Sequence, residues 1–218
     1  AVEDPVKDEK INIIGGLTLF HAAATLGVKK LIFASTGGAM YPDSVKPPYS
    51  EKVASEPISP YGIAKRASEL YLRFAYLTYG MSYTILRYAN VYGPRQNPKA
   101  EAGVISIFGQ NMMSNKPVQI NGDGKQTRDF VFVEDVVRAN MLAMQNKYVG
   151  ILNIGTGKQT SVNTIFKKVK KILRSDAPEK HGPAPSGEVA RSALDARKAR
   201  KILGWEPRVG LDEGLKKT

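Results

Sequence analysis

The chain has 218 residues, of which 42% are apolar and 24% are charged, so it can bury the core of one domain and a small additional region. It contains no cysteine, which excludes disulfides and thiol catalysis, and with only His21 and His181 as imidazole ligands we expect no structural metal. The formal net charge of +12 suggests an anionic partner.

The first half of the chain predicts helices and buried strands in alternation. They are a helix over residues 12–26, a strand over 30–35, a helix over 59–79 and a strand over 83–88. A segment rich in Pro, Ser and Gly precedes the second helix, and Pro60 suits that helix's first turn. This alternation predicts an α/β layer built on a parallel sheet.

The second half predicts a smaller region and then a return to the main sheet. The expected elements are a helix at 104–113, a strand at 118–120, a turn at 121–124, a strand at 130–133, a helix at 134–145 and a strand at 151–154. Residues 176–188 are rich in Pro and Gly and predict a loop, and the basic helix that follows ends at Gly204.

Two basic runs, at residues 167–171 and 197–201, alternate with apolar residues at helical spacing and carry no aromatic side chains that could stack on bases. They indicate solvated helix faces, so we expect no nucleic-acid partner, although binding to an arbitrary duplex with a steep salt dependence would revive that alternative. No apolar run approaches the roughly 18 residues that a membrane span needs. We therefore expect a cytoplasmic protein without membrane contact.

Tyr61 and Lys65 lie one helical turn apart at the start of the helix over 59–79, which places them on one face. An ammonium group at that separation favours the phenolate by about 3 kcal/mol, or roughly two pKa units. The pair can therefore act as a base. Its alternative interpretation is a solvated Lys beside a half-buried Tyr.

Several short motifs follow one another along the whole chain. They are residues 4–6 (DPV) with Asn12 and residues 15–17 (GGL), 33–41 (FASTGGAMY), 59–65 (SPYGIAK), 86–96 (LRYANVYGPRQ), 122–130 (GDGKQTRDF) and 153–157 (NIGTG). In this order they resemble the extended short-chain dehydrogenase/reductase family, and most closely its nucleotide-sugar 4-epimerases of the UDP-glucose/UDP-galactose type. The resemblance implies a Rossmann-type parallel sheet with flanking helices, truncated at its amino-terminal half, and a smaller α/β substrate-binding region.

The resemblance also implies how the chain is divided. Residues 1–95, with a return at about 129–157, would be the carboxyl-terminal part of an NAD-binding Rossmann domain. Residues 96–128 and 158–218 would bind the substrate. The helices at 12–26 and 60–79 would pack against their copies in a homodimer.

By the same resemblance, Tyr61 would remove the proton of the sugar 4-hydroxyl while hydride passes to a permanently bound NAD. Lys65 would stabilise the phenolate and contact the nicotinamide ribose, and Thr36 would hydrogen-bond the 4-oxygen. Ser35 is the alternative hydroxyl if the register differs by one residue. The remaining cofactor contacts would come from Ser35, Tyr88 and Ala89.

The substrate, a nucleotide diphosphate sugar, would be held through its diphosphate by Asn90 and Arg128. The nucleotide end would be lined by Val104, Gln119 and Asn121. Two of these assignments have alternatives: Arg128 could be a hairpin charge paired with Asp129, and Asn90 could be a turn residue.

The sequence departs from the family in its first residues, because no Gly-x-x-Gly-x-x-Gly turn precedes the motifs and Gly15-Gly16 is predicted to lie within a helix. We therefore expect either a piece of a longer enzyme or a gene that has lost its front half, and poor NAD binding by these residues alone. Residues 183–188 (PAPSGE) lack the Arg that commonly clamps the diphosphate, unless Arg191 replaces it, and Pro42 stands where Gly is usual.

Two other functions compete with epimerisation. A non-catalytic dimerising module could keep the helices without binding the cofactor. A 4,6-dehydratase or another reductase of the family is the nearer alternative, but dehydratases carry Asp-Glu directly after the catalytic Thr, where this chain has Gly37-Gly38. Epimerisation or simple 4-oxidation is therefore favoured.

Overall fold

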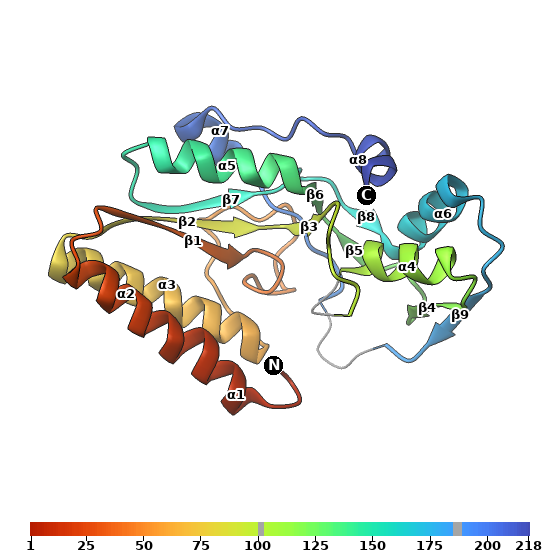
Figure 1. The fold of residues 1–218 in the computed structure, drawn as a ribbon, viewed down its shortest axis with the longest axis horizontal. Helices are drawn as coiled ribbons and strands as arrows, with labels where there is room; N and C mark the ends of the chain where they lie inside the picture. The colour runs from red at the N-terminus through yellow and green to blue at the C-terminus, as the bar shows by residue number, and fades with distance from the viewer. Residues whose placement is uncertain (100–102, 185–188) are drawn as a thin grey trace.

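A parallel sheet lies at the centre of the computed structural model, which describes residues 1–99, 103–184 and 189–218 (Figure 1). Its strands are β1 (Lys30–Thr36), β2 (Ser82–Tyr88) and β7 (Gly150–Ile154), in the order β1-β2-β7. Because all three run in parallel, their carboxyl ends meet at one edge. In open α/β sheets this is the edge where ligands bind.

One face of this sheet is covered by two long helical segments (Figure 1). The first runs through α1 (Pro5–Glu9), the π-helical η1 (Lys10–Gly15) and α2 (Gly16–Thr25), so the helix expected at 12–26 starts earlier, where the Asp4 side chain accepts a hydrogen bond from Lys7 N. The second is α3 (Pro60–Tyr79). Ser59 caps it by accepting a hydrogen bond from Gly62 N, and Gly80 ends it with φ +72°, a backbone angle that glycine adopts without strain.

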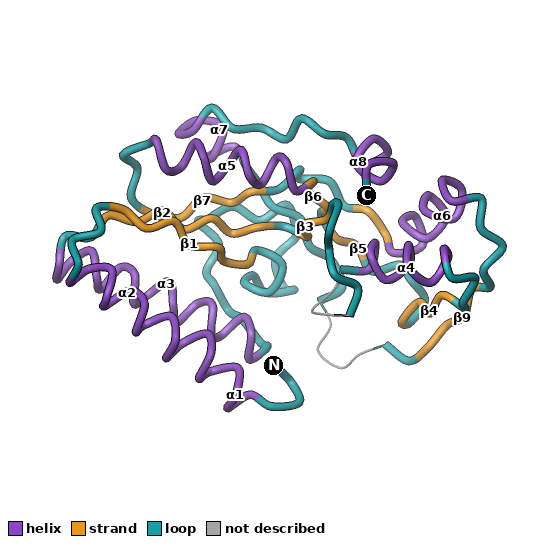
Figure 2. Tube along the Cα trace, viewed as in Figure 1, coloured by secondary structure: helices purple, strands orange, loops and turns teal. Residues whose placement is uncertain are grey.

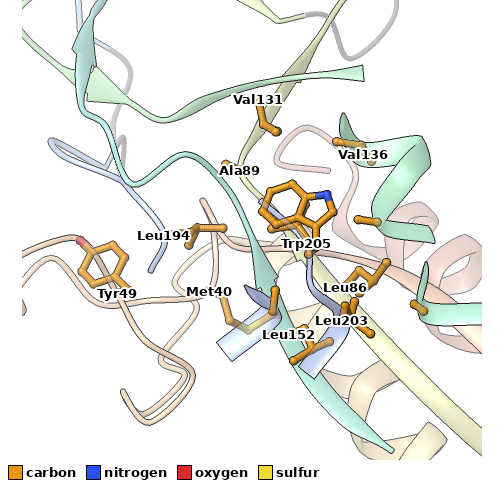
Figure 3. Packing of buried hydrophobic residues seen from close by; sticks show 14 of the residues in the cluster. Met40, Tyr49, Leu86, Ala89, Val131, Val136, Leu152, Leu194, Leu203 and Trp205 are labelled. Atoms are coloured by element: carbon orange, nitrogen blue, oxygen red, sulfur yellow. The ribbon is translucent and has the colours of Figure 1, made fainter. Parts of the chain in front are cut away.

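The opposite face is covered by α5 (Val133–Gln145) and α7 (Arg197–Leu203), with Trp205 in the centre of the core between them and the sheet (Figure 3). Leu86, Leu152 and Leu194 pack in the same cluster. The segment from Leu194 to Trp205 contributes side chains to this core and so packs on the main sheet. Burial of its apolar side chains, which the local sequence does not reveal, decides this placement.

A second, smaller lobe lies beyond the carboxyl edge of the sheet (Figure 2). It consists of α4 (Val104–Met113), β4 (Val118–Asn121), α6 (Val162–Leu173), β9 (Glu179–Gly182) and α8 (Leu211–Lys217). Phe108 and Phe166 meet edge to face in its own core, with ring centroids 5.9 Å apart. The prediction of a loop over residues 176–188 is wrong in part. Residues 179–182 form the strand β9, because β4 lies beside them and pairs with them in parallel.

Short parallel and antiparallel pairs join the two lobes. β3 (Asn90–Tyr92) pairs with β6 (Phe130–Phe132), and β5 (Thr127–Arg128) pairs with β8 (Thr160–Ser161). The strand expected at 130–133 therefore ends one residue early, where α5 begins. Among the described residues, the helices are too short or too polar to cross a membrane.

Candidate active site

The two neighbouring hydroxyls at the end of β1 point to different surroundings. Ser35 is 4% exposed and donates to Glu69 Oε1 at 2.7 Å, on the side of the sheet that α3 covers. Thr36 is the last residue of the strand, and its Oγ1 accepts a hydrogen bond from Ala39 N at 3.3 Å. Because an acceptor oxygen still carries its own proton, the Thr36 hydroxyl can donate to a ligand at the sheet edge.

The start of α3 brings Tyr61 and Lys65 to this edge. Lys65 Nζ donates to the carbonyl oxygen of Ala34 at 3.2 Å, and it lies 5.7 Å from the centroid of the Tyr61 ring. The same ammonium lies 5.1 Å from the centroid of Phe33. The two side chains therefore share a helix face, as their spacing predicts, and the amine lies directly beside the last residues of β1.

Asn90 and the loop after Thr36 approach each other. A Cβ added to Gly38 would lie 3.7 Å from Asn90 Oδ1 and 3.9 Å from Ser192 Oγ. Asn90 is the first residue of β3, and its backbone N–H donates to the backbone carbonyl oxygen of Asp129 at 2.8 Å. Asn90 is thus a strand residue beside the Thr36 loop, and the alternative that it forms a turn is not what the fold shows.

Hydrogen bonds fix Tyr88, the last residue of β2, and Ala89, which follows it. The Tyr88 hydroxyl donates to Asn140 Oδ1 at 3.0 Å, and burial raises the pKa of this phenol. The Tyr88 carbonyl accepts from Gly37 N at 2.8 Å, and Ala89 N donates to the Ile154 carbonyl at 2.9 Å. These contacts tie the strand end to α5, to the Thr36 loop and to β7.

The residues expected at the nucleotide end gather in the second lobe. Asn121 and Arg191 line one pocket of about 460 Å³ together with Lys125 and Gln126. Gln119 lies next to it, since its Nε2 donates to Asn121 Oδ1 at 3.1 Å. Val104 does not line this pocket but begins α4.

Arg128 lies in β5, directly after Thr127, which bridges to Arg191. Its Nη1 donates to the Thr127 carbonyl at 2.9 Å. The neighbouring Asp129 carboxylate is buried and accepts hydrogen bonds from the amides of Thr156 and Leu194. Residues 185–188, which fall in the stretch without the expected Arg, lie outside the described part of the chain.

The site fits one end of an NAD molecule. Thr36 ends β1, Lys65 Nζ is bound to the Ala34 carbonyl of the same strand, and the Tyr61 ring lies beside Lys65. The nicotinamide and ribose of NAD bind such hydroxyl and ammonium donors at the carboxyl edge of a parallel sheet. Gly15 and Gly16 have ordinary helical backbone angles, with φ near −60°, so they form no phosphate-binding turn.

Two buried charged residues, Glu69 of α3 and Arg87 of β2, lie next to the site and are absent from the site residues predicted from the sequence. Glu69 follows Lys65 by one helical turn, and Arg87 lies in the buried strand β2. Both are almost completely buried, at 2% exposure each. A charge within a buried strand, and a carboxylate at i+8 from Tyr61, were the signals that could have revealed them.

The comparisons with known proteins agree with this geometry. A family model described as "NAD dependent epimerase/dehydratase family" matches residues 1–155. Over 218 residues the chain is 45% identical to a putative UDP-glucose 4-epimerase of Methanocaldococcus jannaschii, covering 100% of this chain and 71% of that protein. It is 40% identical over 220 residues to a UDP-glucose 4-epimerase of Mycolicibacterium smegmatis, covering 70% of that protein.

Solved structures give the same picture. The UDP-glucose 4-epimerase of Thermotoga maritima, crystallised with UDP-glucose, superimposes with a TM-score of 0.97 at 52% identity, over 100% of this chain and 71% of that one. The enzyme of Thermus thermophilus, crystallised with NAD, matches with a TM-score of 0.93 at 39% identity, over 100% of this chain and 71% of that one. The resemblance and the Rossmann-type fold predicted from the motifs are confirmed: the chain belongs to the NAD-dependent epimerase/dehydratase family of the extended short-chain dehydrogenases/reductases.

Proposed function

We propose that this chain catalyses, or supplies the catalytic part for, the interconversion of UDP-glucose and UDP-galactose at the sugar C4. The observation that carries the proposal is that Lys65, which lies beside Tyr61, donates to the Ala34 carbonyl, two residues before Thr36 at the carboxyl end of β1. Relatives that are 45% and 40% identical are named for the same reaction, which supports this substrate pair.

Tyr61 is the base in this proposal. Its phenolate accepts the proton of the sugar 4-hydroxyl, and the nearby Lys65 ammonium stabilises the negative charge on the phenol oxygen. Because Lys65 Nζ also donates to the Ala34 carbonyl, the ammonium is fixed relative to β1. Thr36 donates a hydrogen bond to the sugar 4-oxygen and so orients it for proton transfer.

NAD, when bound, supplies reversible hydride transfer to and from C4 of the sugar. Lys65 would also hold its ribose, and the strand end around Ser35, Tyr88 and Ala89 would border its nicotinamide. In this proposal residues 1–95 and 129–157 form the cofactor side of the site. The second lobe, with residues 96–128 and the segments after 157 that pack there, forms the substrate side.

The diphosphate and nucleotide of the substrate would lie toward the second lobe. Asn90 stands beside the Thr36 loop, and Arg128 follows Thr127, the residue that bridges to Arg191. Their cations match the two negative phosphates, and Asn121 in the pocket of Arg191 offers an amide to the nucleotide. Arg191 would thus replace the clamp that the sequence lacks near residue 185.

The packing around Gly37 argues against the dehydratase alternative. A Cβ at this position would lie 2.4 Å from Leu194 Cδ1, so an acidic side chain directly after Thr36 would displace a buried core residue. A side chain at position 38 would fit, since a Cβ there would lie 3.7 Å from its nearest neighbour, but the residue is glycine and so has no carboxyl group. Elimination of water needs an acid and a base next to C5 and C6, which these positions do not supply.

The test is an epimerase assay of the complete gene product that contains these residues. With UDP-galactose and NAD, formation of UDP-glucose is followed by proton NMR. We expect turnover by the native protein, and loss of about 10³-fold or more in Tyr61→Phe with NAD still bound. Tyr71→Phe, which removes a hydroxyl from the same helix, is the matched control and should keep turnover. No UDP-glucose from the native protein, with NAD bound at micromolar concentration, would overturn the proposal.

The same assay separates the enzyme from a non-catalytic module. A calorimetric titration with NAD that shows no binding at millimolar concentration to the complete gene product would favour the module. Binding at micromolar concentration together with turnover supports the enzyme.

We also propose that the protein forms a homodimer through α2 and α3. Their outer faces expose large apolar side chains, and a groove of about 460 Å³ between them is lined by apolar residues that include Leu17, Tyr71 and Phe74. Helix pairs with such faces associate as four-helix interfaces in symmetric dimers.

A further inference from the structure

A buried ion pair joins the helix that carries Tyr61 to the strand next to Thr36. Arg87 donates to Glu69 through two parallel hydrogen bonds, Nε to Oε1 at 2.9 Å and Nη2 to Oε2 at 2.6 Å. The Glu69 and Arg87 side chains are 0% and 2% exposed. A bidentate pair of this kind fixes the relative orientation of its two groups and not only their distance.

The pair is continued across the sheet by a row of polar residues. Ser35, Arg87 and Asn153 face one another in register on β1, β2 and β7. Ser35 donates to Glu69 Oε1, while Tyr41 links the other two, since its hydroxyl accepts from Arg87 Nη1 and donates to Asn153 Oδ1, each at 2.9 Å. Each residue of the row lies one position before the last residue of its strand, at the carboxyl edge of the sheet.

The network therefore meets the site at both of its ends. Glu69 lies one helical turn after Lys65 and two after Tyr61, and Ser35 immediately precedes Thr36. A shift of α3 along or around its axis would break the two Arg87 bonds and the Ser35 bond together. The hydrogen bonds of Glu69 to Ser35 and Arg87 therefore limit how far α3, which carries Tyr61, can move relative to β1, which ends at Thr36.

Stability alone does not explain such a network. Taking two charges out of water costs free energy that their attraction barely repays, and apolar residues of similar volume often stabilise a core as well or better. The neighbouring contact of α2 with the same sheet face uses apolar side chains, among them Phe20 against Phe33. What hydrogen bonds add is a single geometry, which a reaction between groups on two elements requires.

We propose that Glu69 and Arg87 are positioning residues that hold Tyr61 and Lys65 at a fixed place relative to Thr36. The inference rests on the proposed function for its kinetic consequence, but not for the geometry that it assigns. Neither residue touches substrate in this scheme, so both act through the placement of α3.

Kinetics of the complete gene product provide the first test. In Glu69→Asp the charge that balances Arg87 remains, but the carboxylate is one methylene shorter. We expect kcat to fall about 100-fold, because small misplacements of reacting groups cost that much, while KM changes less than about threefold. Glu69→Gln should lower kcat at least as far. Glu213→Gln, which removes an exposed carboxylate from an i,i+4 pair with Lys217, is the matched control and should leave kcat unchanged.

A second measurement does not depend on turnover. With tyrosine labelled by ¹³C at the ring carbon that bears the hydroxyl, the resonance lost in Tyr61→Phe identifies Tyr61, and its pH titration is compared between native protein and Glu69→Asp. A loosened Lys65 should raise the titration midpoint by about one pH unit, a tenfold change in the ionisation constant.

The outcomes separate the two proposals. If the native protein turns over UDP-galactose but Glu69→Asp retains kcat and the native Tyr61 midpoint, the positioning role is wrong and the proposed function stands. If the native protein does not turn over, the proposed function fails, and the Tyr61 midpoint alone decides the inference: an unchanged midpoint in Glu69→Asp overturns it, and a raised one supports it.

Discussion

Gly62 and Ala39 are in such close contact that a Cβ on Gly62 would lie 2.4 Å from the Ala39 carbonyl oxygen. The amide of the same Ala39 donates to Thr36 Oγ1. The first turn of α3, next to Tyr61, therefore packs directly against the loop that orients Thr36. The contact is possible because Gly62 has no side chain.

Gly62→Ala should accordingly disturb the site more than the fold. The added methyl would meet Ala39 O and, at 2.9 Å, the Cβ of Pro57, so α3 must move away from the loop. We expect destabilisation of about 1–3 kcal/mol by urea unfolding, together with at least a tenfold loss of kcat. Gly109→Ala is the control, since a Cβ there meets nothing within 4 Å, and it should be neutral or stabilise by up to about 1 kcal/mol. Equal effects of the two substitutions would contradict the contact.

Phe74→Glu should prevent the proposed dimer. Phe74 is 48% exposed and lines the apolar groove between α2 and α3, where a charge would have to be buried on association. Sedimentation equilibrium of the 218-residue chain should give twice its 23.8 kDa mass for the native sequence and the single mass for the variant. Met113→Glu, at a side chain 78% exposed on α4, should remain dimeric. A native chain that sediments as a monomer at high concentration would refute the interface.

Asp129→Asn should be strongly destabilising. The buried carboxylate accepts from the amides of Thr156, Gly157 and Leu194 and from the Thr156 hydroxyl. An amide group has one oxygen instead of two and would turn an N–H toward these donors. We expect a loss of about 2–4 kcal/mol in the free energy of unfolding. Asp123→Asn, on an exposed turn, should change it by less than about 0.5 kcal/mol, so similar losses would disprove the role of the buried acceptor.

His181 should titrate above its ordinary value of 6.5. Its Nδ1 contacts the Gly122 carbonyl and its Nε2 contacts the Glu179 carboxylate, and both raise the pKa of the imidazole because both favour the protonated ring. A raised folded-state pKa contributes stability that is present below pH 6.5 and is lost as the pH rises through the folded pKa.

Imidazole proton NMR measures this midpoint directly. In Glu179→Gln the His181 midpoint should fall, because the carboxylate that favours the protonated ring is gone. An unchanged His181 midpoint would show that the Glu179 contact does not exist in solution.

Local sequence patterns predicted most of the elements and the family, because those patterns follow from short-range physics. Apolar periodicity located α3, α4 and α5, and Pro60 suits the first turn of α3. Tyr61 and Lys65 share a face because they lie one helical turn apart. The motifs around Thr36 and Asn90 added the chemistry that the resemblance implies, and the family itself is confirmed.

Long-range packing decided the rest. β9 exists because β4 offers it hydrogen bonds, and residues 194–205 join the main core because Trp205 finds an apolar site there. The contact of Ser35 with Glu69, and of Glu69 with Arg87, joins residues from β1, α3 and β2. A residue's sequence neighbours fix its backbone preference, but its hydrogen-bond partner across the core is set only when the elements pack, and that packing placed the buried ion pair beneath Tyr61 and Thr36.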